Sequence, residues 1–213
     1  MDSSPTWEKF GCGWVGDVDG VIDLIEGREV LELGSLAHEL KRDIWEDRVF
    51  YGDRYESHGV VDVELSECSA DDLPLEGDGK HEPVNLRLRY GNGLDCFSDD
   101  LRKARDVIDQ LEVVSIESVP MGKTTAYTDL LLLSGLRTCC NVPHVSVSTG
   151  SFDGKLIQSA LEFGVDEIVV TGKTEFEPGV AIREVGFDPV EVESDSYLQG
   201  GEGFHYGGGG VDG

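Results

Sequence analysis

The chain is poor in basic side chains, and this is its most restrictive property. Its 213 residues include 17 lysines and arginines against 43 aspartates and glutamates, which gives a formal net charge of −26. A surface this negative repels phosphate backbones and anionic lipids, so the composition argues against nucleic-acid and membrane partners. The acidic residues are spread along the whole chain, and multimolar salt screens their repulsion. We therefore expect a cytoplasmic protein of a salt-loving organism.

The sequence also lacks a long apolar run and a regular cysteine framework. No run reaches membrane-spanning length, and the opening residues MDSSPTWEKF do not have the pattern of a signal peptide. The cysteines are odd in number and irregularly spaced, at Cys12, Cys68, Cys96, Cys139 and Cys140. Such spacing suits a reducing cytosol better than a disulfide scaffold.

Residues 84–192 repeat one unit, which is a short β-branched strand, a glycine-containing turn and an amphipathic helix. We expect strands at 84–90, 113–119, 144–149 and 167–172. We expect helices at 99–111, 126–137, 153–164 and 180–186. Strands that alternate with helices of this length predict an α/β fold with a parallel sheet. In such sheets, ligands bind at the loops that follow the strands.

The remaining segments suggest a division of the chain into four parts. Residues 1–61 form an N-terminal part, with a helix-like apolar stripe at 30–47 and an aromatic strand or buried turn at 48–55. Residues 62–83 are acidic and rich in Gly and Pro, as is typical of a linker or insertion. The predicted α/β domain spans 84–197, and the glycine-rich residues 198–213 indicate a disordered tail.

Four segments follow one another in an order found in a known family. They are LELGSLAHELKRDIWEDRVFY, LRLRYGNGLDCFSDDLRKARDVIDQL, TDLLLLSGLRTCCNVPHVSVSTGSFDGKLIQSALEFGVDEI and AIREVGFDPVEVESDSY. Together they resemble the radical SAM enzymes that make the deazaflavin FO and aminofutalosine. The resemblance implies a truncated TIM-type (β/α) barrel of about four C-terminal βα units, plus the N-terminal helix and strand.

The chain departs from this family where the family's chemistry resides. The CxxxCxxC loop that holds a 4Fe–4S cluster is absent from the sequence. Without the cluster there is no electron donor to cleave S-adenosylmethionine, so we expect no radical chemistry and no cofactor. The family's contact loop for S-adenosylmethionine corresponds to GNGLD here, with Asn92 and Asp95 but no histidine. We therefore do not assign that cofactor.

A half-barrel has two free sheet edges and an interior face that needs a cover. We expect this face to be apolar, lined by Val114, Ile116, Val145, Val147, Val169 and Val170. A homodimer that joins two halves is the simplest cover, and a partner subunit is the alternative. Closure by residues 30–55 would need no partner.

The loop MGKTT at 121–125 contains Lys123 and has part of a phosphate-loop pattern. Glu117 stands where that pattern needs a glycine. The competing interpretation is an ordinary loop in which Thr124 or Thr125 caps the next helix.

Two later loops are better candidates for a small-ligand site. Ser148, Thr149 and Gly150 in STGSFDGK offer hydroxyl and amide donors, although a plain helix N-cap also explains this segment. Thr171 and Lys173 follow the next strand, and the alternative role of this lysine is to balance the nearby Glu175 and Glu177. His144 is expected to be a hydrogen-bonded structural histidine, and no metal site is expected.

These observations support three hypotheses. The first is a non-radical, non-catalytic relative of the family that acts as a binding or assembly module. The second is an enzyme of another class that acts on a small polar or anionic substrate at the strand loops. The third is a scaffold subunit, which a large apolar patch over 114–118 and 145–147 would favour. The sequence leaves open whether the chain is an enzyme.

Overall fold

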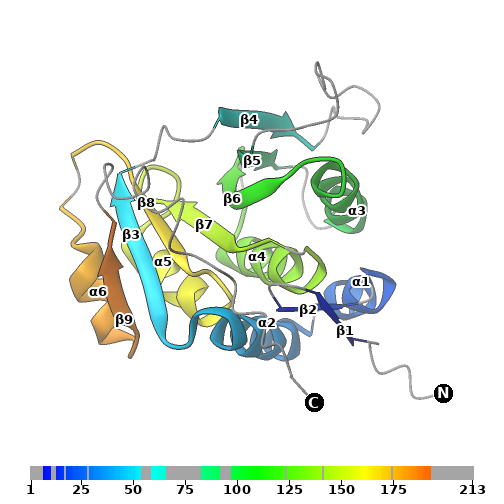
Figure 1. Ribbon diagram of the computed structural model, residues 1–213, viewed down its shortest axis with the longest axis horizontal. Coiled ribbons are helices and arrows are strands. Elements are labelled where there is room, and N and C mark those ends of the chain that lie inside the picture. The colour runs from blue at the N-terminus through cyan, green and yellow to red at the C-terminus, as the bar shows by residue number, and fades with distance from the viewer. Residues whose placement is uncertain are drawn as a thin grey trace, which may run out of the picture.

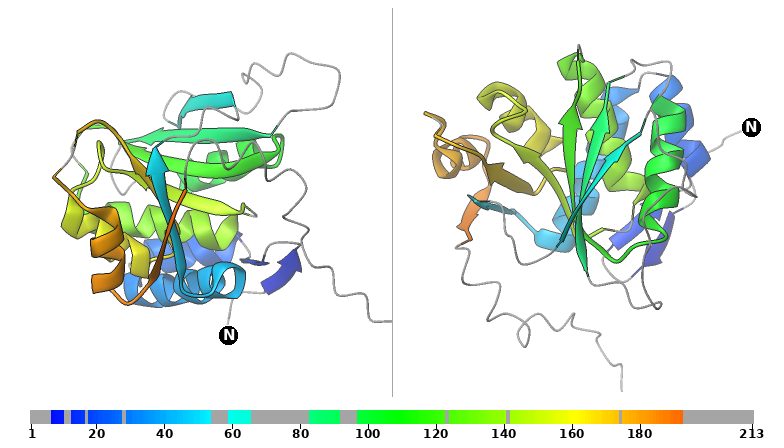
Figure 2. Two further views of the ribbon diagram at one scale, coloured as in Figure 1. Left: turned by 60° about the vertical axis from the view of Figure 1, so that its left-hand side comes forward. Right: turned by 90° about the horizontal axis from the view of Figure 1, so that it is seen from above.

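The computed structural model describes residues 7–10, 13–16, 18–27, 29–53, 59–65, 83–91, 97–122, 124–140, 142–173 and 175–192. Its centre is a sheet of seven parallel strands, and the helices lie on one side of that sheet (Figures 1 and 2). We call the helix-covered side the convex face and the other side the concave face.

The predicted repeat is present, with boundaries that differ by a few residues. Its strands are β5 (Val84–Tyr90), β6 (Val113–Pro120), β7 (His144–Ser148) and β8 (Glu167–Val170). Its helices are α3 (Phe97–Ile108), α4 (Ala126–Cys139), α5 (Gly154–Glu162) and α6 (Pro178–Glu184), followed by β9 (Asp188–Glu191). The predicted α/β class with a parallel sheet is therefore confirmed.

The N-terminal part contributes to the same sheet. Its elements are the hairpin β1 (Trp7–Phe10) and β2 (Gly13–Gly16), α1 (Val18–Glu26), α2 (Val30–Trp45), β3 (Arg48–Asp53) and β4 (Gly59–Glu64). The strand order is β4-β5-β6-β7-β8-β3-β9, so β3 lies between β8 and β9. Among the described strands, β4 and β9 each pair on one side only, and the sheet is open.

Each repeat strand separates its side chains onto the two faces. In β5, Leu86, Leu88 and Tyr90 are buried, whereas the residues between them are partly exposed. The Tyr90 hydroxyl donates a hydrogen bond to Asp129 of α4 at 2.8 Å, which places this set on the convex face. Strand side chains alternate with a period of two, so the residues in register with Leu86 belong to the same helix-packed core.

This register corrects the predicted lining of the concave face. Ile116 pairs with both Leu86 and Val145, so these side chains, with Val147, are buried against the helices. Of the six predicted residues, the register leaves Val169 on the concave face, opposite Ser148. The expected apolar interior was wrong because the helix layer, and not a partner, covers the apolar side of the strands.

The predicted helix caps are confirmed at two loops. Thr125 is the N-cap of α4, and its hydroxyl accepts a hydrogen bond from the backbone N–H of Thr128. Asp153 is the N-cap of α5 and accepts from the N–H of Leu156 at 2.9 Å. Caps of this kind satisfy backbone donors that the first helical turn leaves free.

Candidate functional site

One row of side chains crosses the concave face at the same level of all seven strands. From β4 to β9 its members, paired neighbour to neighbour, are Asp62, Arg87, Glu117, Ser146, Glu167, Phe50 and Val190. We call this set the cross-strand row. It changes from charged residues at the β4 end, through hydroxyl and carboxyl groups in the middle, to apolar residues at the β9 end.

The centre of the cross-strand row is a compact polar network. The Ser115 hydroxyl, one level below the row, donates to Glu167 Oε2 at 2.6 Å and lies 3.3 Å from the Ser146 hydroxyl. Ser146 in turn donates to the Ile116 carbonyl at 3.1 Å. Ser115, Glu117, Ser146 and Glu167 are each between 1% and 8% exposed. Buried polar groups of this density on a sheet face are unusual unless they serve a ligand or a structural network.

The charged end of the row forms a ladder of ion pairs. Arg87 Nε donates to Glu117 at 3.0 Å, and its Nη1 lies 3.6 Å from Asp62. Arg89 also donates to Asp62, at 3.2 Å. The ladder ties the edge strand β4 to β5 and β6.

An aromatic cluster of Trp45, Phe50 and His144 begins at Phe50 in the row and continues below it. The Trp45 and His144 rings stack with centroids 4.5 Å apart, and the Phe50 ring meets His144 edge-on at 5.2 Å. His144 Nδ1 donates to Asp166 Oδ2 at 2.6 Å, and Asp166 is also held by Arg137. The prediction of a hydrogen-bonded His144 is confirmed.

Burial sets the protonation of the groups at the centre. It raises the pKa of Glu167, and the neighbouring hydroxyls of Ser115, which donates to this carboxylate, and of Ser146 oppose that rise. Burial, together with the nearby Arg137 guanidinium, lowers the pKa of His144 to about 3. The imidazole is therefore neutral near pH 7, with its proton on Nδ1 and an acceptor lone pair on Nε2.

The loops after β7 and β8 bring three of the predicted residues together. The backbone N–H of Thr171 donates to the Thr149 hydroxyl at 2.9 Å. A Cβ at Gly150 would lie 2.6 Å from Thr171 Oγ1, so the close approach of the loops needs glycine there. These hydroxyls join the two loops at the rim of the concave face.

The other predicted residues have different surroundings. Ser148 is buried, and its hydroxyl donates to Ser151 at 3.0 Å, as in a local turn. Lys173 is exposed. Asn92, Asp95 and Lys123 lie outside the described residues.

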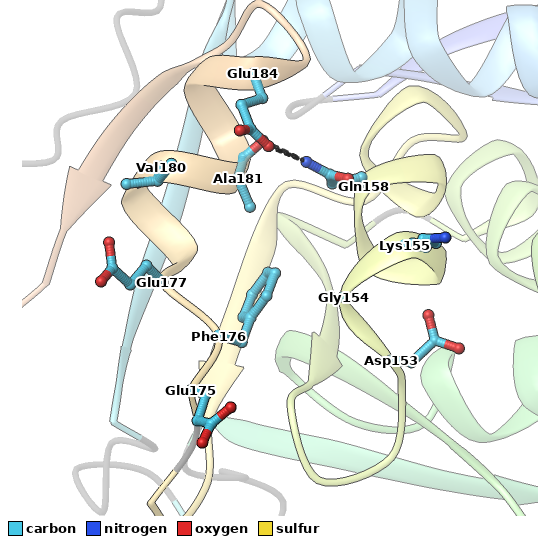
Figure 3. Close-up of a pocket in the computed structure, with 10 residues that line it drawn as sticks. All are labelled: Asp153, Gly154, Lys155, Gln158, Glu175, Phe176, Glu177, Val180, Ala181 and Glu184. Carbon is cyan, nitrogen blue, oxygen red and sulfur yellow. Dashed lines mark hydrogen bonds between the residues drawn. The ribbon is translucent and has the colours of Figure 1, made fainter.

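A groove of about 610 Å³ lies between α5 and α6, beyond the same two loops (Figure 3). Phe176 stands at its centre, and Gln158 donates to Glu184 across one end at 2.9 Å. Asp153 and Glu177 at its rim are the N-cap residues of α5 and α6. Helix starts favour acidic residues, which accounts for these two carboxylates without a ligand.

The two described cysteines do not fit the role of cluster ligands. Cys139 and Cys140 are adjacent and buried at the C-terminal end of α4. This end of the helix lies at the edge of the sheet opposite the carboxyl ends of the strands. Burial raises the pKa of the Cys140 thiol, which disfavours the thiolate that a cluster needs. Among the described residues, no group of three or more His, Cys, Asp and Glu side chains is arranged to hold a metal ion.

None of the helices in the described part of the chain combines the length and apolar character that a membrane crossing requires.

The sequence analysis missed the central residues of the cross-strand row. A usable signal was present in the alternation of VNLRLRY, VVSIESV and HVSVST. Parallel strands covered on both faces read as continuous apolar runs. Polar residues at every second position indicate instead that one face is apolar and the other polar.

A scan against protein-family models and a search of curated proteins both find no match to this chain.

Proposed function

We propose that this protein is a binding module for a small polar ligand, which it holds on the concave face of its sheet. The observation that carries the proposal is the buried polar centre of the cross-strand row. Glu117, Ser146 and Glu167 come from three neighbouring strands at one level and make the centre of this face polar. Ligand sites combine such convergent polar groups with an apolar or aromatic wall, which Phe50 supplies at the next strand.

The cross-strand row lies below the carboxyl ends of the strands, since Glu167 is the first residue of β8, and the loops above the row also favour ligand binding. The loops joined by Thr149 and Thr171 form the rim of the concave face at the carboxyl ends of β7 and β8. This is the edge at which parallel α/β sheets bind their ligands. A non-radical relative of the FO and aminofutalosine synthases would retain a sheet of this kind without a cluster, and we keep that relationship as part of the proposal.

The scaffold hypothesis has less support. It required an apolar patch over 114–118 and 145–147, and Ile116, Val145 and Val147 are fully buried in the core. A homodimer or a partner subunit that covers the open half-barrel remains a proposal beside ligand binding.

A matched pair of serine variants tests the binding proposal. Fragments are screened against the full chain in multimolar KCl by ligand-observed NMR, with Ser146→Ala and Ser159→Ala beside the wild type. Ser146 is on the concave face, whereas Ser159 is exposed on α5 and bonds to its own helix. We expect some fragments to bind the wild type. These fragments should bind Ser146→Ala more weakly and Ser159→Ala with unchanged affinity. The proposal would be contradicted if no fragment bound, or if every bound fragment had the same affinity for Ser146→Ala as for the wild type.

One observation favours enzymatic activity as a second candidate. Glu117 is ion-paired with Arg87, whereas Glu167 faces serines and its pKa is raised by burial. Two carboxyl groups in unlike environments are the usual arrangement for an acid and a base. Turnover of a bound ligand that is lost in Glu167→Gln, with binding retained, would establish this candidate.

A further inference from the structure

The buried carboxylates at the sheet differ in whether a cation accompanies them. Glu117 is paired with Arg87, and Asp166 with Arg137. Glu167 is 8% exposed, and the groups that act on it are the hydroxyls of Ser115 and Ser146. No cationic partner of Glu167 is found within the described part of the chain. A buried carboxylate is ordinarily paired or bound to a cation, because burial of an isolated charge is costly.

The hydrogen-bond donors around Glu167 are already committed within the protein. Ser115 donates to Glu167 itself, and Ser146 donates to the Ile116 carbonyl. The Nδ1 proton of His144 is given to Asp166. Each hydroxyl has a single proton, so what these groups have left to offer a ligand is lone pairs.

His144 adds an acceptor that is independent of the carboxylates. Its ring is 7% exposed, and no residue of the described ranges donates to Nε2. The register with Ser115 places this side chain on the concave face, one level below Ser146. The site therefore contains a carboxylate, two hydroxyl oxygens and an imidazole nitrogen as acceptors, beside the aromatic ring of Phe50.

We infer that the ligand of the concave face is a small planar organic cation with N–H donors, of the amidinium or guanidinium class. Its N–H groups would bind Glu167 and the acceptor atoms of Ser115, Ser146 and His144. Its apolar part would contact Phe50, which neighbours Glu167 in the cross-strand row. Planar N–H cations match carboxylate geometry with two parallel hydrogen bonds, and they stack on aromatic rings. This inference rests on the proposed binding function and names the class of its ligand.

Three probes of one shape test the charge that the site selects. Benzamidine, benzamide and benzoate share a phenyl ring and carry positive, neutral and negative planar groups. Each is titrated into the full chain near neutral pH, followed by amide shifts in NMR spectra. We expect benzamidine to bind with one-to-one stoichiometry and at least about tenfold more tightly than the other two probes, since an ionic pair in a buried site is worth more than a neutral contact.

A matched pair of carboxylate variants locates the bound cation. Glu167→Gln should weaken benzamidine binding by about tenfold or more, because it replaces the carboxylate with an amide. Glu184→Gln removes an exposed carboxylate of the α5–α6 groove and should leave the affinity unchanged. If Glu167→Gln does not fold, the order of the three probes on the wild type decides the question.

The outcomes separate this inference from the proposed function. Tighter binding of benzamide or benzoate, or benzamidine binding that depends on Glu184, would overturn the cationic ligand class. The ligand class would also fail if no probe bound although the fragment screen found ligands that depend on Ser146, and the binding function would then stand. Failure of both the probes and the fragments would overturn both.

Discussion

The two faces of the sheet are made from the same strands, and they carry opposite chemistry. On the convex face, Leu86, Ile116 and Val145 pack under the helices as one apolar core. On the concave face, one residue further along each strand, Arg87, Glu117 and Ser146 form part of the polar cross-strand row. The comparison shows that period-two alternation alone can place a stabilising face and a candidate binding face on one sheet.

The largest loss of stability is expected at Asp166, which joins α4 to β7 directly before β8 begins. Asp166 is fully buried, and it accepts hydrogen bonds from Arg137, from His144 and from the backbone N–H of Val145. Asp166→Ala removes the carboxylate that pairs with the buried Arg137. We expect the free energy of unfolding to fall by roughly 3–5 kcal/mol, measured by urea denaturation. The exposed Asp188→Ala should change it by less than about 0.5 kcal/mol. Equally small losses of stability in both variants would show that Asp166 does not stabilise the fold.

Two substitutions on opposite faces of the sheet test whether the faces have different roles. Ile116→Ala empties a fully buried position on the convex face and should cost about 2–5 kcal/mol of stability. Ser146→Ala, on the concave face, should cost about 1 kcal/mol, since it removes one hydrogen bond. Ligand affinity should instead fall more in Ser146→Ala than in Ile116→Ala. Similar losses of both stability and affinity in the two variants would show that the faces do not divide these roles.

Lys41 tests how far the convex side tolerates a buried charge. Its ammonium group is fully buried on α2, donates to the Leu161 carbonyl at 2.9 Å and lies 3.4 Å from the Phe187 ring centroid. Burial, with a smaller contribution from Arg137, lowers the pKa of Lys41 from 10.5 to about 7. Between these two pH values the unfolded chain binds more protons than the folded one, so stability rises with pH.

We expect the unfolding free energy of the wild type to increase between pH 7 and about 10, by up to a few kcal/mol. Lys41→Met should lose this increase, while Lys155→Met, on the exposed surface of α5, should keep it. Urea denaturation at several pH values measures the slope. If Lys41→Met kept the wild-type slope, a lowered pKa of the Lys41 amine would be ruled out.

The smallest expected effect lies at the rim of the concave face. Thr149→Ala removes the hydroxyl that accepts from the Thr171 backbone N–H. Stability should fall by about 1 kcal/mol or less, because one hydrogen bond at an exposed site is lost. Amide hydrogen exchange should nevertheless speed up in both loops, 149–152 and 171–173. Unchanged exchange in the loop after β8 would show that Thr149 does not hold it.

Much of the fold could be predicted, because regular alternation of strands and helices is encoded locally. The repeat from β5 to α6 follows from apolar periodicity, and the caps at Thr125 and Asp153 follow from side-chain chemistry. The insertion of β3 between β8 and β9 could not be predicted in this way. It depends on contacts between residues more than a hundred positions apart, such as Phe50 with Glu167.

The candidate site was predicted only in part, and for a different reason. The loops contain small polar residues, so Thr149, Gly150 and Thr171 could be predicted as candidates, and the structure brings them together at the rim. The cross-strand row was missed because each of its residues comes from a different strand and no local motif links them. Its alternating pattern was visible, but we expected apolar residues on the concave face, and Ile116, Val145 and Val147 face the helices instead.

The most direct test of the concave face as the binding site is a crystal structure with a fragment that binds the wild type. We predict the fragment on the concave face, in contact with Ser146 and Glu167 and beside the ring of Phe50. A fragment seated instead in the groove around Phe176, with Ser146 and Glu167 unchanged, would contradict the account.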